Sequence, residues 1–160
     1  MNRDHRYAVA LAWTGNLGDG TKGPASYSRD HEVTVEGVAP IAGSSDVAFR
    51  GDPARWNPEQ LLLASVAQCH MLWYLSLAAS AGITVVEYAD QATGLMTEHA
   101  DGAGQFVSVT LRPEVTIADA EDTPRAHELH DQVGSYCFVA RSVNFPIRHE
   151  VTIRAAGDGG

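Results

Sequence analysis

A long apolar segment constrains the fold of this chain more than any other sequence feature. Fifteen of the nineteen residues from Leu61 to Ala79 are apolar. The four residues before Leu61, Asn57-Pro58-Glu59-Gln60, form a variant of the capping box that starts helices. Gly82 is typical of the position just past a helix end. We therefore predict a helix from Pro58 to about Ala81, roughly 34 Å long.

A helix that is apolar on every side either spans a membrane or forms the buried axis of a domain or dimer. Four polar residues interrupt this one, and no basic cluster flanks it to set an orientation: Ser65, Gln68, His70 and Ser76. The rest of the chain alternates between polar and apolar residues, as soluble β-structure does. We therefore expect a buried helix and no membrane partner.

The remaining sequence predicts strands around this helix and a second, shorter one. Alternating patterns predict strands at 6–13, 26–38, 46–49, 83–96, 105–117 and 146–154. The turn-rich segment 100–104 predicts a hairpin between two of them. Thr123 and Pro124 predict the start of a second helix that continues toward Tyr136, and 137–143 predicts a short third one. This order favours an α+β fold with antiparallel sheets on helices.

Length and charge narrow the classes of partner and compartment. A chain of 160 residues favours a single domain over 1–160, with a flexible tail from about 155 to 160. Eleven basic and twenty acidic side chains give a net charge of −9, the opposite of a nucleic-acid-binding surface. We expect no nucleic-acid partner. The first six residues lack the apolar stretch of a signal peptide, which favours a cytoplasmic location.

The chain has seven histidines, two cysteines and fifteen glycines, the residue types from which metal and nucleotide motifs are built. Cys69 and His70 are adjacent and point to different helix faces, and the pair His127 and His130 has no nearby third ligand. The glycine-rich segment 15–23 precedes a predicted strand instead of a helix, and no P-loop occurs. The sequence therefore predicts no metal and no cofactor.

The two cysteines are the strongest candidates for chemistry. Cys69 lies about three turns into the long helix, beyond the reach of the helix dipole. A reactive Cys69 therefore needs a cation from elsewhere in the fold, with three candidates: Arg29, Arg50 and Arg55. Cys137 follows the second predicted helix and fits a resolving thiol. The alternative is that Cys69 is an ordinary small apolar residue of the core.

Glu59 is a further candidate in the first turn of the long helix. It lies ten residues before Cys69, a rise of about 15 Å along the axis. The two side chains cannot touch within one straight helix, so a joint role needs a bridging side chain or a second subunit. The alternative is an acidic residue that interacts favourably with the helix dipole and does nothing else.

These residues resemble a known family. The run Asn57-Pro58-Glu59-Gln60-Leu61-Leu62, followed by Cys69, is similar to the motif of the OsmC/Ohr family of osmotically induced and organic-hydroperoxide-resistance proteins. Phe49-Arg50-Gly51-Asp52, Gly82 and the segment from Cys137 to Pro146 follow in the family's order. The resemblance covers the chain from about Tyr7 to Ile153.

The resemblance implies a thiol peroxidase of the stress response. Cys69 is then the peroxidatic cysteine and Cys137 the resolving one, while Glu59 and an arginine hold the thiolate. Arg29 is the preferred arginine, because the hydroperoxide-resistance branch draws its own from the early β region. The implied fold is an intertwined homodimer, with sheets around two long central helices and active sites at the subunit interface. This arrangement would let Glu59 of one chain approach Cys69 of the other.

The implied reaction reduces an organic hydroperoxide through a Cys69 sulfenic acid and a Cys69–Cys137 disulfide, which an external dithiol then reduces. Four apolar residues are candidates to line the approach to Cys69: Leu62, Val66, Trp73 and Phe138. Gln68 and His70 around Cys69, and Phe138 after Cys137, depart from the family pattern and indicate a divergent subfamily. The alternative function is a non-catalytic OsmC-like protein that binds a small molecule in an apolar interfacial cleft near Trp56, Trp73 and Tyr74.

Overall fold

The computed structural model describes residues 3–157, which form two compact units, one ending at Leu62 and the other beginning at Leu63. Each unit combines β-strands with helical turns or helices, and together they give the α+β content that the sequence predicts. The single domain over 1–160 stays a prediction.

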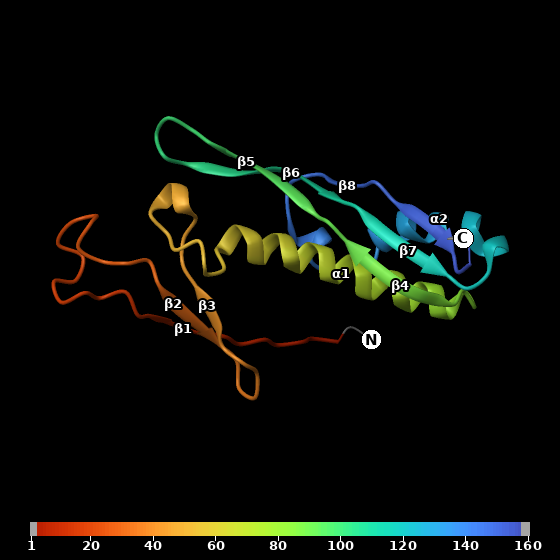
Figure 1. Ribbon diagram of the computed structural model, residues 1–160, viewed down its shortest axis with the longest axis horizontal. Helices are drawn as coiled ribbons and strands as arrows, with labels where there is room; N and C mark the ends of the chain where they lie inside the picture. The colour runs from red at the N-terminus through yellow and green to blue at the C-terminus, as the bar shows by residue number, and fades with distance from the viewer. Residues whose placement is uncertain (1–2, 158–160) are drawn as a thin grey trace. The chain divides into compact units, whose positions relative to one another are not determined.

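The N-terminal unit is built on a three-stranded antiparallel sheet of order β1-β2-β3 (Figure 1). Its strands are β1 (Ala10–Trp13), β2 (His31–Thr34) and β3 (Ile41–Gly43). The first two are shorter than the patterns at 6–13 and 26–38 indicate, and β3 was not predicted. The strand predicted at 46–49 is wrong, because Val47–Phe49 form a 3-10 helix, η1, in which Asp46 accepts a hydrogen bond from the Ala48 backbone.

The start of the long helix α1 (Pro58–Ser80) confirms the capping box. The side chain of Asn57 accepts a hydrogen bond from the Gln60 backbone at 2.8 Å, and the side chain of Gln60 accepts one from the Asn57 backbone at 3.2 Å. These reciprocal bonds satisfy two amide groups that have no partner within the helix. Gly82 has a positive φ of 79°, which ends the helix where the sequence indicates.

The C-terminal unit holds two three-stranded sheets, of order β4-β7-β9 and β5-β6-β8. The strands are β4 (Val85–Asp90), β5 (Thr93–Glu98), β6 (Gly104–Leu111), β7 (Pro113–Ile117), β8 (Ile147–His149) and β9 (Thr152–Ala155). The predicted hairpin is present as β5 and β6 (Figure 1). The sheets are mixed instead of purely antiparallel, since β8 runs parallel to β6 and β9 parallel to β7. The long connection through α2 makes this parallel return possible.

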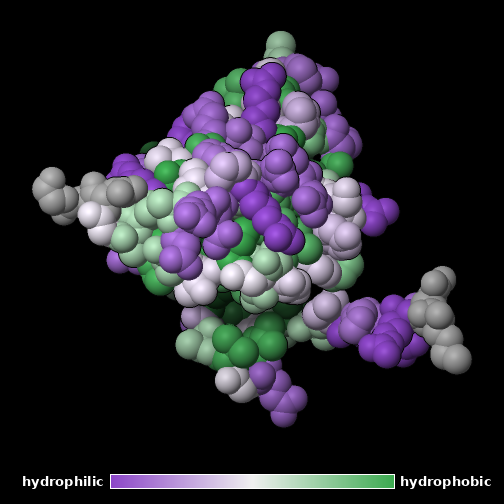
Figure 2. All heavy atoms as spheres, turned by 90° about the vertical axis from the view of Figure 1, so that its right-hand side faces the viewer, coloured by the Kyte–Doolittle hydropathy of each residue, from purple (hydrophilic) through white to green (hydrophobic). Residues whose placement is uncertain are grey.

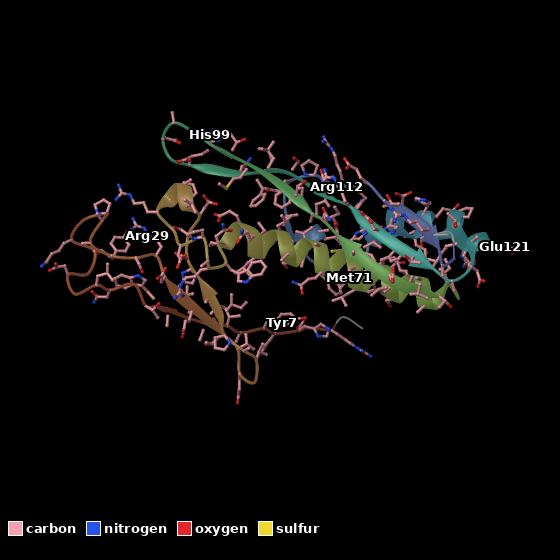
Figure 3. The ribbon with its side chains drawn as sticks, in the orientation of Figure 1. Tyr7, Arg29, Met71, His99, Arg112 and Glu121 are labelled. Carbon is pink, nitrogen blue, oxygen red and sulfur yellow. The ribbon has the colours of Figure 1, made fainter. Side chains whose placement is uncertain are left out.

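Each of the three long strands predicted in this unit is divided into two. Arg112 forms hydrogen bonds at all three points of division. Its backbone N–H donates to Asp90 at 2.7 Å, at the end of β4. Its guanidinium donates to Thr93 at 2.8 Å, at the start of β5, and to Glu150 at 2.8 Å, between β8 and β9. Figure 3 labels Arg112 at this crossing. Long-range contacts of this kind are not visible in an alternating pattern, which explains why the breaks were missed.

Helix α2 (Thr123–Val133) packs with one face on the core. Its buried residues recur at three and four positions: Ala126, Leu129, His130 and Val133. Asp122 occupies the cap position, so Thr123 is the first helical residue and not the cap that the sequence indicated. The end of the unit that faces the viewer in Figure 2 is largely hydrophilic. Two 3-10 helices, η2 (Ala120–Asp122) and η3 (Ala140–Ser142), flank α2.

The predicted tail differs in where it begins. Ala155 belongs to β9, and the backbone of Ala156 donates a hydrogen bond to Ile117 at 2.7 Å. The strand therefore reaches one residue further than 146–154 indicates. Residues 158–160 of the predicted tail lie outside the described residues.

Helix α1 buries one stripe of its surface and leaves apolar residues uncovered. The buried residues are Val66, His70, Tyr74 and Ala78, each four positions after the last. Val66, Tyr74 and Ala78 pack against β6, β7 and α2 in two apolar clusters. By length and composition α1 is apolar enough to cross a membrane, and 22% of its most apolar window is buried within this chain. Leu72 is 59% exposed. One chain therefore does not cover the helix fully.

Candidate functional site

The structure brings Cys69 and Cys137 into contact within the C-terminal unit. The thiol of Cys137 donates a hydrogen bond to Cys69 Sγ at 2.8 Å. Both cysteines are free, and the separation exceeds the length of about 2.05 Å of a disulfide bond. Cys137 is buried, whereas Cys69 is partly exposed. The pair is therefore a reduced dithiol whose sulfur atoms are already adjacent.

The turn that follows α2 fixes the position of Cys137. Its backbone N–H donates to the Val133 carbonyl at 2.9 Å, which continues the helical turn past the end of α2. The Ala140 backbone N–H donates to Cys137 Sγ at 3.4 Å. Burial, and next the hydrogen bond to Cys69, raise the pKa of Cys137 to about 11. Cys137 therefore keeps its proton at neutral pH and acts as the donor of the pair.

Aromatic side chains adjoin the dithiol. Trp73 lies one turn after Cys69 on α1 and stacks on Tyr136, with ring centroids 5.3 Å apart. The edge of Phe138 meets the same indole at 5.6 Å, and Phe138 is 67% exposed. Trp73 and Phe138, two of the four residues expected to line an apolar approach to Cys69, thus contact each other. Leu62 belongs to the N-terminal unit.

Cys137 also lines a cavity of about 140 Å³. Its walls are mostly apolar and include Val66, the third of the expected approach residues, which is buried. Two imidazoles, His70 and His149, provide its polar lining. Tyr74, which the sequence placed near a ligand cleft, is fully buried and does not line this cavity. Cys137 therefore contacts Cys69 and also lines a cavity that carries two histidines.

Sequence reasoning missed a cluster of three histidines, in which His70 and His130 are buried and His149 is partly exposed. His70 Nε2 lies 2.9 Å from His130 Nδ1, so one ring donates a hydrogen bond to the other. His149 stacks on His70 with centroids 4.4 Å apart, and Tyr74 stacks on His130 at 3.8 Å. Burial lowers the pKa of both His70 and His130 to about 3, so both rings are neutral at pH 7. A histidine within an apolar helix was the one signal, and its partners come from α2 and β8.

The histidine cluster does not make a metal centre. Across residues 3–157, no three His, Cys, Asp or Glu side chains are arranged to hold a metal ion. In the hydrogen bond between His70 and His130 one nitrogen donates its N–H and the other accepts, so neither nitrogen offers a free lone pair to a metal.

Glu59 and Arg29 complete the set of predicted site residues. Glu59 lies in the first turn of α1, ten residues before Cys69, and its Oε2 atom is buried without a hydrogen-bond partner. Arg29 belongs to the N-terminal unit. Its Nη1 donates to the carbonyls of Pro24 and Tyr27, each at 2.8 Å, and its guanidinium lies 4.2 Å from the Tyr27 ring centroid. The sequence placed Arg29 in a strand, but β2 begins two residues later, at His31.

The other two candidate arginines have different surroundings. Arg55 Nε lies 3.7 Å from Asp30 and 3.6 Å from Asp52, so two carboxylates offset its charge. Arg50 has a positive φ of 65° and closes the 3-10 turn η1. The hydrogen-bond partners of Arg29 are neutral carbonyls, which leaves its charge uncompensated by them. Of the four predicted site residues, the structure brings together Cys69 and Cys137.

Comparison with known proteins places these features in a family. A family model described as OsmC-like protein matches residues 51–152, which contain α1 and both cysteines. The chain belongs to the OsmC-like family. This OsmC-like protein is 21% identical to the uncharacterized protein YmaD of Bacillus subtilis (strain 168), over 97% of the chain and 99% of YmaD.

Solved structures share the fold of this OsmC-like protein. An OsmC-like protein of unknown function from Vibrio cholerae, VCA0330, is 25% identical, with 92% of this chain and 99% of that chain covered and a TM-score of 0.82. An organic hydroperoxide resistance protein from Elizabethkingia anophelis, solved with thiocyanate bound, is 18% identical, with 96% and 100% covered and a TM-score of 0.66. Across these pairs the fold persists while most residues differ.

Proposed function

We propose that this OsmC-like protein is a thiol-dependent peroxidase that reduces organic hydroperoxides in the cytoplasm. The observation that carries the proposal is the 2.8 Å contact between the thiols of Cys69 and Cys137. Two free thiols at this distance pass to a disulfide with little movement of the backbone. Membership of a family that includes hydroperoxide-resistance proteins supports the same chemistry.

The reaction proceeds in three steps. The Cys69 thiolate attacks the terminal oxygen of the hydroperoxide, the O–O bond breaks, and an alcohol leaves after taking up a proton. The Cys137 sulfur then attacks Cys69 of the resulting sulfenic acid, which forms the disulfide and releases water. An external dithiol reduces the disulfide. Cys69 is the attacking residue because it is the partly exposed member of the pair, while Cys137 is buried.

The surroundings of the dithiol favour an organic substrate. Trp73, Tyr136 and Phe138 offer apolar surface beside Cys69, and much of Phe138 is uncovered. Transfer of an alkyl or aryl group from water to such a surface lowers the free energy of binding, whereas hydrogen peroxide has no apolar group to transfer.

Arg29 and Glu59 are proposed to support the Cys69 thiolate. A guanidinium stabilises an adjacent thiolate and can polarise the peroxide. Glu59 has a buried oxygen without a hydrogen-bond partner, which fits an acceptor for such a guanidinium. Because Glu59 lies ten residues before Cys69 on the same helix, a joint role needs a bridging side chain or a second copy of the chain.

A homodimer supplies that second copy. Leu72 on α1 and Leu11 on β1 are 59% and 69% exposed, and both lie on elements rich in apolar residues. Exposed apolar side chains that gather on one element often mark an interface between subunits. We propose that a second copy of the chain covers these side chains.

Single-turnover mass spectrometry tests the proposed activity. The reduced protein receives one equivalent of cumene hydroperoxide, and its mass and its remaining alkylatable thiols are measured. We expect the loss of two hydrogen atoms and of both free thiols, and no peroxide consumption by Cys69→Ser. Equal and negligible consumption by wild type and Cys69→Ser would overturn the proposal and favour a protein that binds a small apolar molecule.

A further inference from the structure

The second step of the proposed reaction requires the Cys137 proton to leave. Burial raises the pKa of Cys137 to about 11, so the thiol keeps its proton at pH 7. A thiol is a far weaker nucleophile than its thiolate. Attack on the sulfenic acid therefore needs a base that Cys137 can reach. The 140 Å³ cavity beside Cys137 contains two candidates, His70 and His149.

The surroundings of the two imidazoles distinguish them. His70 Nε2 is occupied by His130, and no carboxylate contributes to its titration. His149, on β8, is influenced by the carboxylates of Asp131 from α2 and Asp90 from β4. These two charges stabilise the imidazolium that forms when a proton arrives. Burial acts in the opposite direction and lowers the pKa of His149, so its ring is neutral and able to accept a proton at pH 7.

We propose that His149 accepts the proton of Cys137 across the cavity during disulfide formation and returns it to the leaving hydroxide. The inference rests on the proposed function. The S–S bond forms between Cys137 and Cys69, the S–O bond of the Cys69 sulfenic acid breaks, and the proton passes from Cys137 sulfur to His149 and then to the hydroxide, which leaves as water. No external oxidant or reductant takes part in this step.

The cavity and the charges around it fit this role. A volume of about 140 Å³ has room for water, since about 10–15 Å³ of such a volume is enough to hold one molecule. Water can therefore carry the proton between sulfur and imidazole. The titratable groups that face His149 are His70 on α1, His130 and Asp131 on α2, and Asp90 on β4. The backbone N–H of Arg112 donates a hydrogen bond to the Asp90 carboxylate at 2.7 Å.

Rapid-quench mass spectrometry after one equivalent of cumene hydroperoxide separates the two steps. For His149→Ala we expect sulfenic acid to form at the wild-type rate and disulfide formation to slow by about a hundredfold at pH 7. Added imidazole should restore much of the rate, because a cavity of about 150 Å³ holds a benzene-sized ring. The deficit should shrink as the pH approaches the value at which Cys137 ionises by itself. His99→Ala, at the tip of the β5–β6 hairpin (Figure 3), is the matched control.

Asp131→Asn provides a second variant, since it leaves the imidazole in place and alters an exposed side chain. We expect a smaller slowing of the same step. Disulfide formation at the wild-type rate in both variants would overturn the inference, as would a slowing of His149→Ala that neither imidazole nor high pH relieves. Failure of the proposed function is distinct, because the wild type would then form neither sulfenic acid nor disulfide.

Discussion

The thiol of Cys137 lies 2.8 Å from the sulfur of Cys69, although 68 residues separate the two cysteines in the chain. Cys69 comes from the middle of α1 and Cys137 from the turn after α2. Both pack against the same apolar cluster, which includes Val133 and Tyr74. The packing of α1 against α2 therefore sets the geometry of the dithiol, and no local sequence motif does.

Replacement of Cys137 by serine should stop the cycle after one turnover. Cys69 still reacts with the hydroperoxide, but no thiol is available to condense with the sulfenic acid. We expect one equivalent of peroxide to be consumed, a dimedone adduct on Cys69, and steady-state turnover limited to the direct reaction of the sulfenic acid with the external dithiol. An unchanged steady-state rate would show that Cys137 is not the resolving cysteine.

Replacement of Arg29 by methionine should slow the first step specifically. The variant keeps a side chain of similar length and removes the charge that we propose for thiolate and peroxide stabilisation. We expect sulfenic acid formation to slow by about a hundredfold, and disulfide formation to be unaffected once the sulfenic acid is present. Arg55→Met is the control, because Asp30 and Asp52 already offset the charge of Arg55. Stopped-flow measurements at several peroxide concentrations give both rates, and equal rates in the two variants would exclude Arg29.

The buried histidines should make the protein less stable in mild acid. The folded-state pKa values of His70 and His130 are lowered to about 3, below the unfolded value of about 6.5. Their contribution to stability is present above about pH 6.5 and is lost as the pH falls toward 3, because the unfolded chain binds protons that the fold excludes. Each histidine that titrates in this way costs about 1.4 kcal/mol per pH unit within the window.

His130→Phe tests this pH dependence against its physical cause. Phenylalanine can keep the stack on Tyr74, which has a centroid distance of 3.8 Å to His130, and it cannot bind a proton. We expect urea denaturation to show a less stable variant at pH 7.5, because His70 Nε2 loses its partner. The difference from wild type should narrow as the pH falls from 6.5 to 5. A constant difference across that range would show that His130 does not titrate as its burial implies.

A positive charge on the exposed face of α1 should disrupt the proposed dimer. Leu72 is 59% exposed in the single chain, and an arginine buried in an apolar interface without a partner costs several kcal/mol. We expect Leu72→Arg to convert the dimer to monomers in sedimentation experiments and to abolish peroxidase activity. Glu121→Gln, at the hydrophilic end of the C-terminal unit (Figure 3), changes the net charge equally and should stay dimeric. A wild-type protein that sediments as a monomer would refute the dimer.

Local sequence signals were enough to predict the bounds of the long helix and to recognise the family. Asn57 and Gln60 cap α1 through backbone atoms three residues away, and Gly82 ends the helix through its own φ, so the bounds of α1 follow from short-range chemistry. The motif from Asn57 to Cys69 likewise identified the family before any fold was known. Glu59 and Arg29 remain predictions in their roles.

Tertiary structure decided where strands break, how they pair and which side chains share the site. Arg112 divides three apparent strands through partners about twenty and forty residues away, and β8 and β9 pair in parallel only because the chain returns through α2. His149 joins His70 and Cys137 around one cavity for the same reason. Hydrophobic periodicity reports which face of an element is buried, but it carries no information about the element that covers that face, and the site lies where such faces meet.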